Sequence, residues 1–359
     1  MTRESRFRSR RAFLAGAGSA ATLGLAGCLG SAGGTEYDTL RVGTYQAYVD
    51  APSTSAGAYV KSQFEERTDY DLEWVVREYE LTDFIQRRQQ GAPLEADVFL
   101  GVTPQDLVRA DSELDQPLFE GFQTDAIDNA GNVEDVYHFD PQRRVLPTGA
   151  SYVALVYDET VVDAPTSFEA LTEPAYENQL LLANPESTTT GLLFLLWTVE
   201  TMGRDSYLDY WARLMDNGVN VLGSWSSAYN AYSQEEAAMV VSYSTDQVYA
   251  ASQDQDMARH QVAFPNDQGY AYVDGLAKFA TTDRDELVRE FAAFMLDPEV
   301  QRETAVKNVG IPTVSNATLP SEFQQYAHVP EEPIQLSYDV LAEHMADWRE
   351  AWAQQVASK

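Results

Sequence analysis

Aromatic and hydroxyl side chains gather at four places in this 359-residue sequence, each at the end of a predicted strand or the start of a predicted helix. Tyr45 and Tyr48 follow the first predicted strand, segments 224–229 and 243–249 follow later ones, and segment 187–191 opens an apolar helix. Aromatic faces attract flat cations, and a helix start favours an anion. Helix capping and loop packing are the structural alternatives. Because all four lie at strand–helix junctions, they predict a ligand cleft.

The motifs of common enzymes are absent from the sequence. The four histidines, His138, His260, His328 and His344, are scattered and show no metal-ligand spacing. There is no G-x-S-x-G elbow, no Walker loop and no G-x-G-x-x-G. Cys28 is the single cysteine, so neither an internal disulfide nor a thiolate cluster can form. We therefore expect a binding protein that needs no cofactor or metal, not an enzyme.

Strands and helices alternate along most of the chain, and these elements must position the aromatic and hydroxyl side chains of the predicted cleft. Apolar segments such as 40–45, 96–101 and 152–157 predict strands, whereas 58–67 and 191–200 predict helices. This alternation is typical of an α/β fold with a mainly parallel sheet flanked by helices. About 320 ordered residues exceed the usual size of one domain, so we expect two lobes.

The charge balance excludes one class of partner. The chain has 24 Lys and Arg against 56 Asp and Glu, a formal net charge of −32, and beyond residue 27 the charge is −36 because the first 27 residues hold five arginines and one glutamate. Such a surface repels phosphate backbones, so we expect no nucleic-acid partner. With only four lysines, the composition also predicts a halophilic acidic surface that stays soluble in high salt. An acidic secreted protein is the alternative.

The N-terminal segment reads as an export signal. Residues 9–14, Ser-Arg-Arg-Ala-Phe-Leu, match the twin-arginine pattern, and an uncharged run rich in Gly and Ala follows. The run ends in Leu-Ala-Gly-Cys28, which resembles a lipoprotein signal-peptidase box, so we expect a lipid anchor on Cys28. We assign residues 1–27 to the signal peptide and 28–38 to a flexible tether. The alternative is a soluble protein with a chance hydrophobic leader.

The order of the motifs resembles that of the thiamine-binding subunits of ABC importers. The matching segments are N-P-x-S/T-x-T-x-G-L-x-x-L-L-W at 184–197, the G-W-S-x-A-Y type at 223–229, S-Y-x-T-x-x-x-Y at 242–249, F-M-x-x-P-x-x-Q at 294–301 and N-x-T-L-P at 316–320. The resemblance implies a two-lobed type II solute-binding fold with the ligand in the interlobe cleft. It also implies that the chain crosses between the lobes twice.

The resemblance further implies domain boundaries, partners and a location. Residues 39–148 and 268–359 form the first lobe, with the lobe of the C-terminal helices left open, and residues 149–267 form the second. The implied partners are thiamine or thiamine phosphate and the permease and ATPase subunits of an importer. We expect a monomer at the outer face of the cytoplasmic membrane, held there by Cys28.

Four aromatic residues receive binding roles from the resemblance. It implies that Tyr45 and Tyr249 flank the aromatic rings of the ligand, and that Trp225 and Tyr243 line the pocket. Stacking suits thiamine because its thiazolium is cationic, and an aromatic face attracts a cation by about 0.5–2 kcal/mol.

Polar positions are also implied, and here the sequence departs from the family. Thr188 replaces a family serine and is expected to meet the hydroxyethyl end or a phosphate ester. Glu78 is expected to accept a hydrogen bond from the aminopyrimidine or to lie near the cation. At this position the family has a carboxylate beside a glycine, and here the glycine is absent. Val309 stands where the family has a tryptophan, so one stacking wall is lost. Asp246 replaces a neutral residue and adds charge.

Three alternatives share this fold. Thiaminases attack thiamine with a cysteine, and the only cysteine here is Cys28 of the lipobox, so that activity is excluded. Ferric-ion-binding subunits use clustered tyrosinates, which Tyr243, Tyr249 and Asp246 could imitate, but Trp225 and the lack of a nearby histidine argue against iron. A polyamine-binding subunit is the closest rival, because acids and aromatics also suit ammonium groups.

Overall fold

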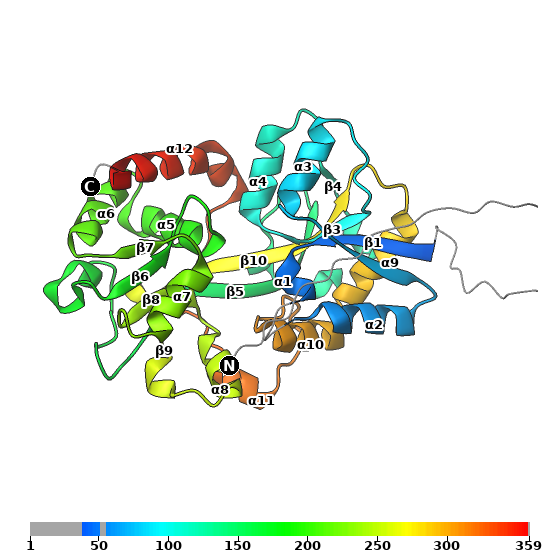
Figure 1. Ribbon diagram of the computed structural model, residues 1–359. Helices are drawn as coiled ribbons and strands as arrows, with labels where there is room; N and C mark the ends of the chain where they lie inside the picture. Colours follow the sequence, from blue (N-terminus) through cyan, green and yellow to red (C-terminus); the bar gives the residue numbers. More distant parts are fainter. Residues whose placement is uncertain (1–37, 51–54, 358–359) are drawn as a thin grey trace, which may run out of the picture. The chain divides into compact units, whose positions relative to one another are not determined.

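The structure is a computed structural model that describes residues 38–50 and 55–357 (Figure 1). The predicted twin-arginine signal, Cys28 and the tether up to residue 37 lie outside the described residues. Among the helices that are described, none has both the length and the apolar character needed to cross a membrane.

The described residues form one mixed sheet of 11 strands. Its main path has the order β2-β1-β3-β10-β5-β8-β6-β7; β4 and β11 pair with β10, and β9 pairs with β5. The strands are β1 (Thr39–Thr44), β2 (Asp71–Val76), β3 (Val98–Val102), β4 (Phe119–Glu120), β5 (Val145–Tyr157), β6 (Leu180–Ala183), β7 (Asn220–Leu222), β8 (Met239–Tyr243), β9 (Gln261–Ala263), β10 (Gln268–Phe279) and β11 (Glu332–Ile334). β1 is parallel to β2 and β3, and β6 is parallel to β7 and β8, whereas β5 and β10 are antiparallel.

Helices cover both faces of this sheet, and capping residues explain where several of them begin. Thr103 and Asp106 form a reciprocal capping box at α4, and Ser224 caps α7 through the N–H of Ser227. The helices are α1 (Gln46–Val49), α2 (Gly57–Arg67), α3 (Leu81–Gln89), α4 (Pro104–Glu113), α5 (Thr189–Met202), α6 (Tyr207–Asp216), α7 (Trp225–Ser233), α8 (Asp246–Ser252), α9 (Asp285–Met295), α10 (Pro298–Asn308), α11 (Ser321–Tyr326) and α12 (Tyr338–Ala357).

Separate hydrophobic cores define two lobes, as expected for a two-lobed α/β fold. In the first lobe, Val98 and Leu100 of β3 face a core shared with α2 and α9, and Phe99 faces a second core shared with α3 and α4. In the second lobe, Leu180 and Leu182 of β6 face α5 and α6, while Leu181 faces α7. This alternation follows from the two-residue period of a strand and places helices on both faces of each lobe.

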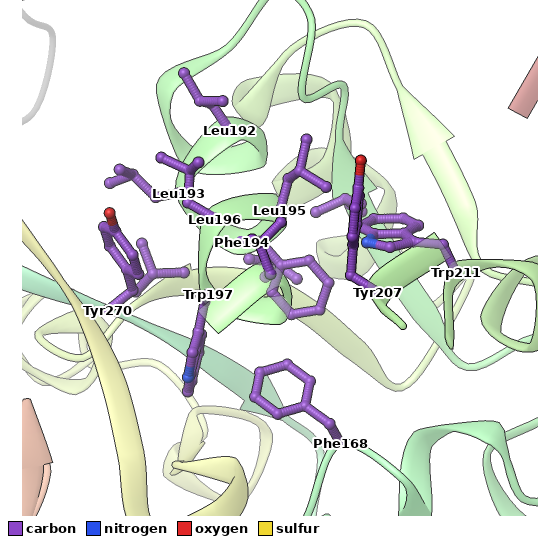
Figure 2. Close-up of a cluster of buried hydrophobic side chains, with 14 of the residues drawn as sticks. Phe168, Leu192, Leu193, Phe194, Leu195, Leu196, Trp197, Tyr207, Trp211 and Tyr270 are labelled. Atoms are coloured by element: carbon purple, nitrogen blue, oxygen red, sulfur yellow. The ribbon is translucent and has the colours of Figure 1, made fainter. Parts of the chain in front are cut away.

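The core of the second lobe is built around α5, which is buried on all sides from Thr190 to Val199 (Figure 2). The ring of Trp197 meets Phe168 edge-on at 4.8 Å, and Trp211 Nε1 donates a 2.9 Å hydrogen bond to Thr198. A Cβ atom at Gly191 would lie 2.1 Å from the carbonyl oxygen of Ala183. The glycine is therefore required for α5 to start against the end of β6.

The chain crosses between the lobes three times, so the expectation of two crossings is incomplete. The paired strands β5 and β10 make two of these crossings (Figure 1). After α10, which packs in the first lobe, α11 contacts α8 of the second lobe, and the N–H of His328 donates to the carbonyl of Ser244. β11 then pairs with the start of β10.

The C-terminal helices divide between the lobes. α9 and α10 add Phe291 and Val300 to a core of the first lobe. α12 instead buries Trp348 and Trp352 in the core around α5 and α6. The predicted boundaries at residues 148 and 267 fall within β5 and next to the start of β10, so continuous strands, not loops, join the lobes there.

Candidate functional site

A cavity of about 690 Å³ lies between the two lobes. The first lobe contributes Tyr45 and Asn308, the second contributes Trp225 and Tyr249, and the connecting strands β5 and β10 form its floor. Its volume lies within the range of about 300–1,000 Å³ that is usual for small-molecule sites. The cavity is therefore large enough for a small organic ligand that both lobes contact.

Seven aromatic side chains line this cavity. They are Tyr45, Tyr48, Trp225, Tyr229, Tyr243, Tyr249 and Tyr272. Several of these rings contact one another. The ring centroids of Trp225 and Tyr229 are 5.1 Å apart, and those of Tyr243 and Tyr272 are 5.9 Å apart. A lining of this kind provides faces for a flat or cationic ligand.

Tyr45 forms the wall of the first lobe. It follows β1, and its ring packs so closely on Gly101 that a Cβ atom there would lie 2.7 Å from the ring. Asn308 Nδ2 donates a 3.3 Å hydrogen bond to the Tyr45 hydroxyl. Burial raises the pKa of Tyr45 well above its ordinary value, so the ring is a neutral phenol in the cavity wall.

The second lobe holds its aromatic wall with hydroxyl contacts. Trp225 is the first residue of α7, not part of a turn, and its Nε1 donates to Ser242 Oγ at 3.2 Å. The hydroxyls of Tyr243 and Thr190 hydrogen-bond at 2.9 Å. These contacts fix both rings at the end of β8 and the start of α5.

Asp246 lies at the cavity, but both of its carboxylate oxygens are engaged by protein groups. The Tyr229 hydroxyl donates to Oδ1 at 2.6 Å, and Nδ1 of His260 lies 2.7 Å from Oδ2. The expectation that no histidine lies near Asp246 is therefore wrong. The Asp246 side chain is only 4% exposed. Asp246 therefore positions Tyr229, whose hydroxyl oxygen keeps its lone pairs for a ligand donor.

Asp274 of β10 is the second acid in the cavity wall, and the sequence analysis did not identify it. It is 9% exposed, and the Tyr272 hydroxyl donates to its Oδ2 at 3.0 Å. Burial raises the pKa of Asp274 to about 6, which the bond from Tyr272 opposes. An acidic residue inside the otherwise uncharged strand segment 271–277 was the signal that could have found it.

The structure brings five of the seven sequence-predicted residues to the cavity. They are Tyr45, Trp225, Tyr243, Asp246 and Tyr249. Val309 also lines it and ends α10 in the left-handed region at φ 53°, which is unusual for a β-branched residue. The residues that sequence reasoning missed include Tyr272, Asp274 and Asn308, whereas Tyr229 was included only as the end of segment 224–229.

Glu78 and Thr188 are not among the described residues that line the cavity. Glu78 is exposed in the turn between β2 and α3. Glu80, two residues later, accepts from the N–H of Gln46 and lies near enough to Tyr45 to raise its pKa further. The hydroxyl of Thr188 is used locally: it accepts from the N–H of Gly191 and donates to the carbonyl of Asn184.

A second cavity of about 750 Å³ lies elsewhere, lined by residues of segments 124–146 and 337–339. Phe139 and Tyr338 are its aromatic members, and it draws nothing from α7, α8 or β8. Although this second cavity is slightly larger, two aromatic rings line it, against seven in the cavity between the lobes. In the described part of the chain, no group of three or more His, Cys, Asp and Glu is arranged to hold a metal ion.

Comparisons with known proteins identify the family and support the fold. The model of a family described as bacterial extracellular solute-binding protein matches residues 60–331. The chain is 27% identical to the thiamine-binding periplasmic protein of Escherichia coli K12, over 89% of this chain and 93% of that protein. A solved periplasmic thiamin binding protein superposes with a TM-score of 0.73 at 26% identity, covering 89% and 96% of the two chains. A ferric binding protein from Campylobacter jejuni, at 14% identity over 88% and 99%, shares the fold with a TM-score of 0.71.

Proposed function

This chain belongs to the family of bacterial extracellular solute-binding proteins, and we propose that it binds thiamine between its two lobes and delivers it to an ABC permease and its ATPase. The ligand is the one named for the Escherichia coli relative. The fold and the family support a substrate-binding role, in which the lobes close around the ligand by bending at the strands that join them.

The chemistry of the cavity lining carries the proposal. Among the described lining residues there are seven aromatic rings and two carboxyl groups, and there is no Lys, Arg or His. Thiamine is a cation with two flat rings, a thiazolium and an aminopyrimidine. Aromatic walls can stack on both rings, and the acids supply negative potential for the cation.

The same lining supports unphosphorylated thiamine as the preferred form. A phosphate ester needs cationic side chains or free helix N–H groups. The described lining supplies no cation, and Thr188 already accepts from the Gly191 N–H at the start of α5. We therefore propose that Thr188 caps the start of α5 and does not contact a phosphate.

The route to the membrane is part of the proposal and rests on the sequence. The twin-arginine pattern supports export of the folded chain, and Cys28 supports lipid anchoring at the outer face of the cytoplasmic membrane. We propose that the protein acts there as a monomer without catalysing a reaction. Its single cysteine, Cys28, is assigned to the anchor and leaves no thiol for a thiaminase reaction.

Calorimetric titration of the chain in molar KCl tests this function. Thiamine is expected to bind at one site per chain, more tightly than thiamine phosphate, while spermidine gives little heat and Fe³⁺ gives no visible absorption band. The described aromatic rings can stack on the rings of thiamine, and spermidine has no ring to stack on. Binding of spermidine or of coloured iron, with no response to either thiamine form, would overturn the assignment.

A further inference from the structure

Asp274 belongs to β10, one of the two strands that form the floor of the cavity. It sits in β10 opposite Gly149 of β5, where the register of the two strands shifts at the next residue. A methyl group at position 149 would lie 2.9 Å from Asp274 Oδ1. The glycine therefore leaves room for the carboxyl group beside the β5 backbone, in the wall of the cavity.

The hydrogen bonds of the two acids at the cavity differ. Both oxygens of Asp246 have protein partners, Tyr229 and His260. Within the described part of the chain, the carboxyl group of Asp274 accepts one hydrogen bond, from the Tyr272 hydroxyl to Oδ2. Oδ1 of Asp274 therefore keeps its full capacity to accept.

The charges around Asp274 leave it without a cationic partner among the described lining residues. The titratable groups that act on it or feel its charge are Tyr272 of β10, Tyr45 and Tyr48 after β1, Tyr243 of β8 and Asp106 of α4. The tyrosines are neutral phenols, since burial raises their pKa values, and Asp106 only adds repulsion. A buried carboxylate without a counter-charge is unfavourable, so a cation brought by the ligand would stabilise it.

We propose that Asp274 recognises the positive charge of the ligand and makes the cavity selective for a flat cation over a neutral molecule of the same shape. This inference rests on the proposed function, and it assigns recognition of the ligand's positive charge to one residue, Asp274. The acid identified by the motif resemblance, Asp246, instead positions Tyr229. Tyr272 orients the Asp274 carboxylate through its hydrogen bond.

The test compares two probes: thiamine and its neutral analogue in which a thiophene replaces the thiazolium ring. The wild-type chain is expected to prefer thiamine at least tenfold at pH 8, and Asp274→Asn is expected to reduce this preference to threefold or less. Glu290→Gln, which removes an exposed acid of α9, is the matched control and should keep the wild-type preference. An undiminished preference in a folded Asp274→Asn protein would overturn the inference.

The pH dependence of the wild type provides a second readout that needs no variant. Asp274 must be ionised to attract the cation, and its pKa of about 6 means that the preference should hold above pH 7 and fall about tenfold towards pH 5. The aminopyrimidine of each probe is titrated separately without the protein, so that its own protonation can be divided out of the ratio. A constant ratio between pH 8 and 5 would contradict the inference, whereas failure of the wild type to bind thiamine at all would instead remove the proposed function.

Discussion

Replacing Tyr45 with alanine is expected to lower the affinity for thiamine by about 2 kcal/mol, roughly 30-fold, because it removes the aromatic wall of the first lobe. The ring is held against Gly101 and by the hydrogen bond from Asn308, so it is already oriented for a ligand. A preorganised ring loses little entropy on binding, and its removal therefore costs most of the contact. Calorimetric titration of the variant measures the change.

The Tyr45→Phe variant separates the ring from its hydroxyl. It keeps the stacking face and loses the bond to Asn308, so its affinity should stay within about threefold of the wild type. Thermal unfolding of both variants checks that the lobes remain folded. If Tyr45→Ala folds and binds thiamine as tightly as the wild type, Tyr45 does not form a wall of the site.

Replacing Arg144 with methionine is expected to reduce the free energy of unfolding by about 3–5 kcal/mol. The guanidinium is buried and donates from Nη2 to Asp140 at 3.1 Å and from Nη1 to Asp111 at 2.9 and 2.8 Å. Burial disfavours its charge, but these bonds outweigh it and raise the pKa of Arg144. Without the arginine side chain, the Asp140 carboxylate, with a side chain only 1% exposed, keeps backbone N–H donors but loses its counter-charge.

The position of this network gives it a role beyond stability. Asp111 belongs to α4 of the first lobe, Arg144 precedes β5, and the Tyr338 hydroxyl at the start of α12 donates to Asp111. The network therefore ties α12 to the first lobe next to the strands that join the lobes.

An exposed ion pair provides the control for Arg144. Arg213 and Glu169 are 2.7 Å apart, with side chains 48% and 62% exposed, so Arg213→Met should cost no more than about 1 kcal/mol. Urea unfolding of both variants in molar KCl measures the difference, because salt screens exposed pairs more than buried ones. Equal small losses in both variants would show that the Arg144 cluster contributes no more than a surface pair.

Much of the fold could be predicted from the sequence because its apolar segments have clear periods. The expected strand at 40–45 and helix at 58–67 are β1 and α2 within a residue, and the two-lobed α/β fold is confirmed. α7 and α8 were not expected as helices, since their small and polar residues carry no apolar stripe. The third crossing was missed because it depends on contacts of α11 and α12 that are far apart in the sequence.

The candidate site could be predicted where a residue directly follows a strand. Tyr45 and Tyr243 reach the cavity because the end of each strand fixes the direction of the chain. Glu78 lies in a turn, where a shift of two residues exchanges it for Glu80 beside Tyr45. Asp274 lies within a strand, and only the pairing of β10 with β5 places its carboxyl group in the wall of the cavity.

We propose that the acidic surface has a different role from the acids of the cavity. The net charge of −32 looks suited to attracting a cation, yet in the high salt that the composition predicts, the screening length is about 3 Å. Attraction over longer distances is then largely lost. Recognition is therefore left to buried groups such as Asp274 and Tyr45.

A crystal structure of the chain grown with thiamine in molar KCl tests the central claim most directly. The account predicts one thiamine in the cavity between the lobes, with its rings against Tyr45 and Tyr249 and its thiazolium close to Asp274. Thiamine bound at another place, such as the cavity beside His138, or crystals in which the interlobe cavity stays empty at saturating thiamine, would contradict it.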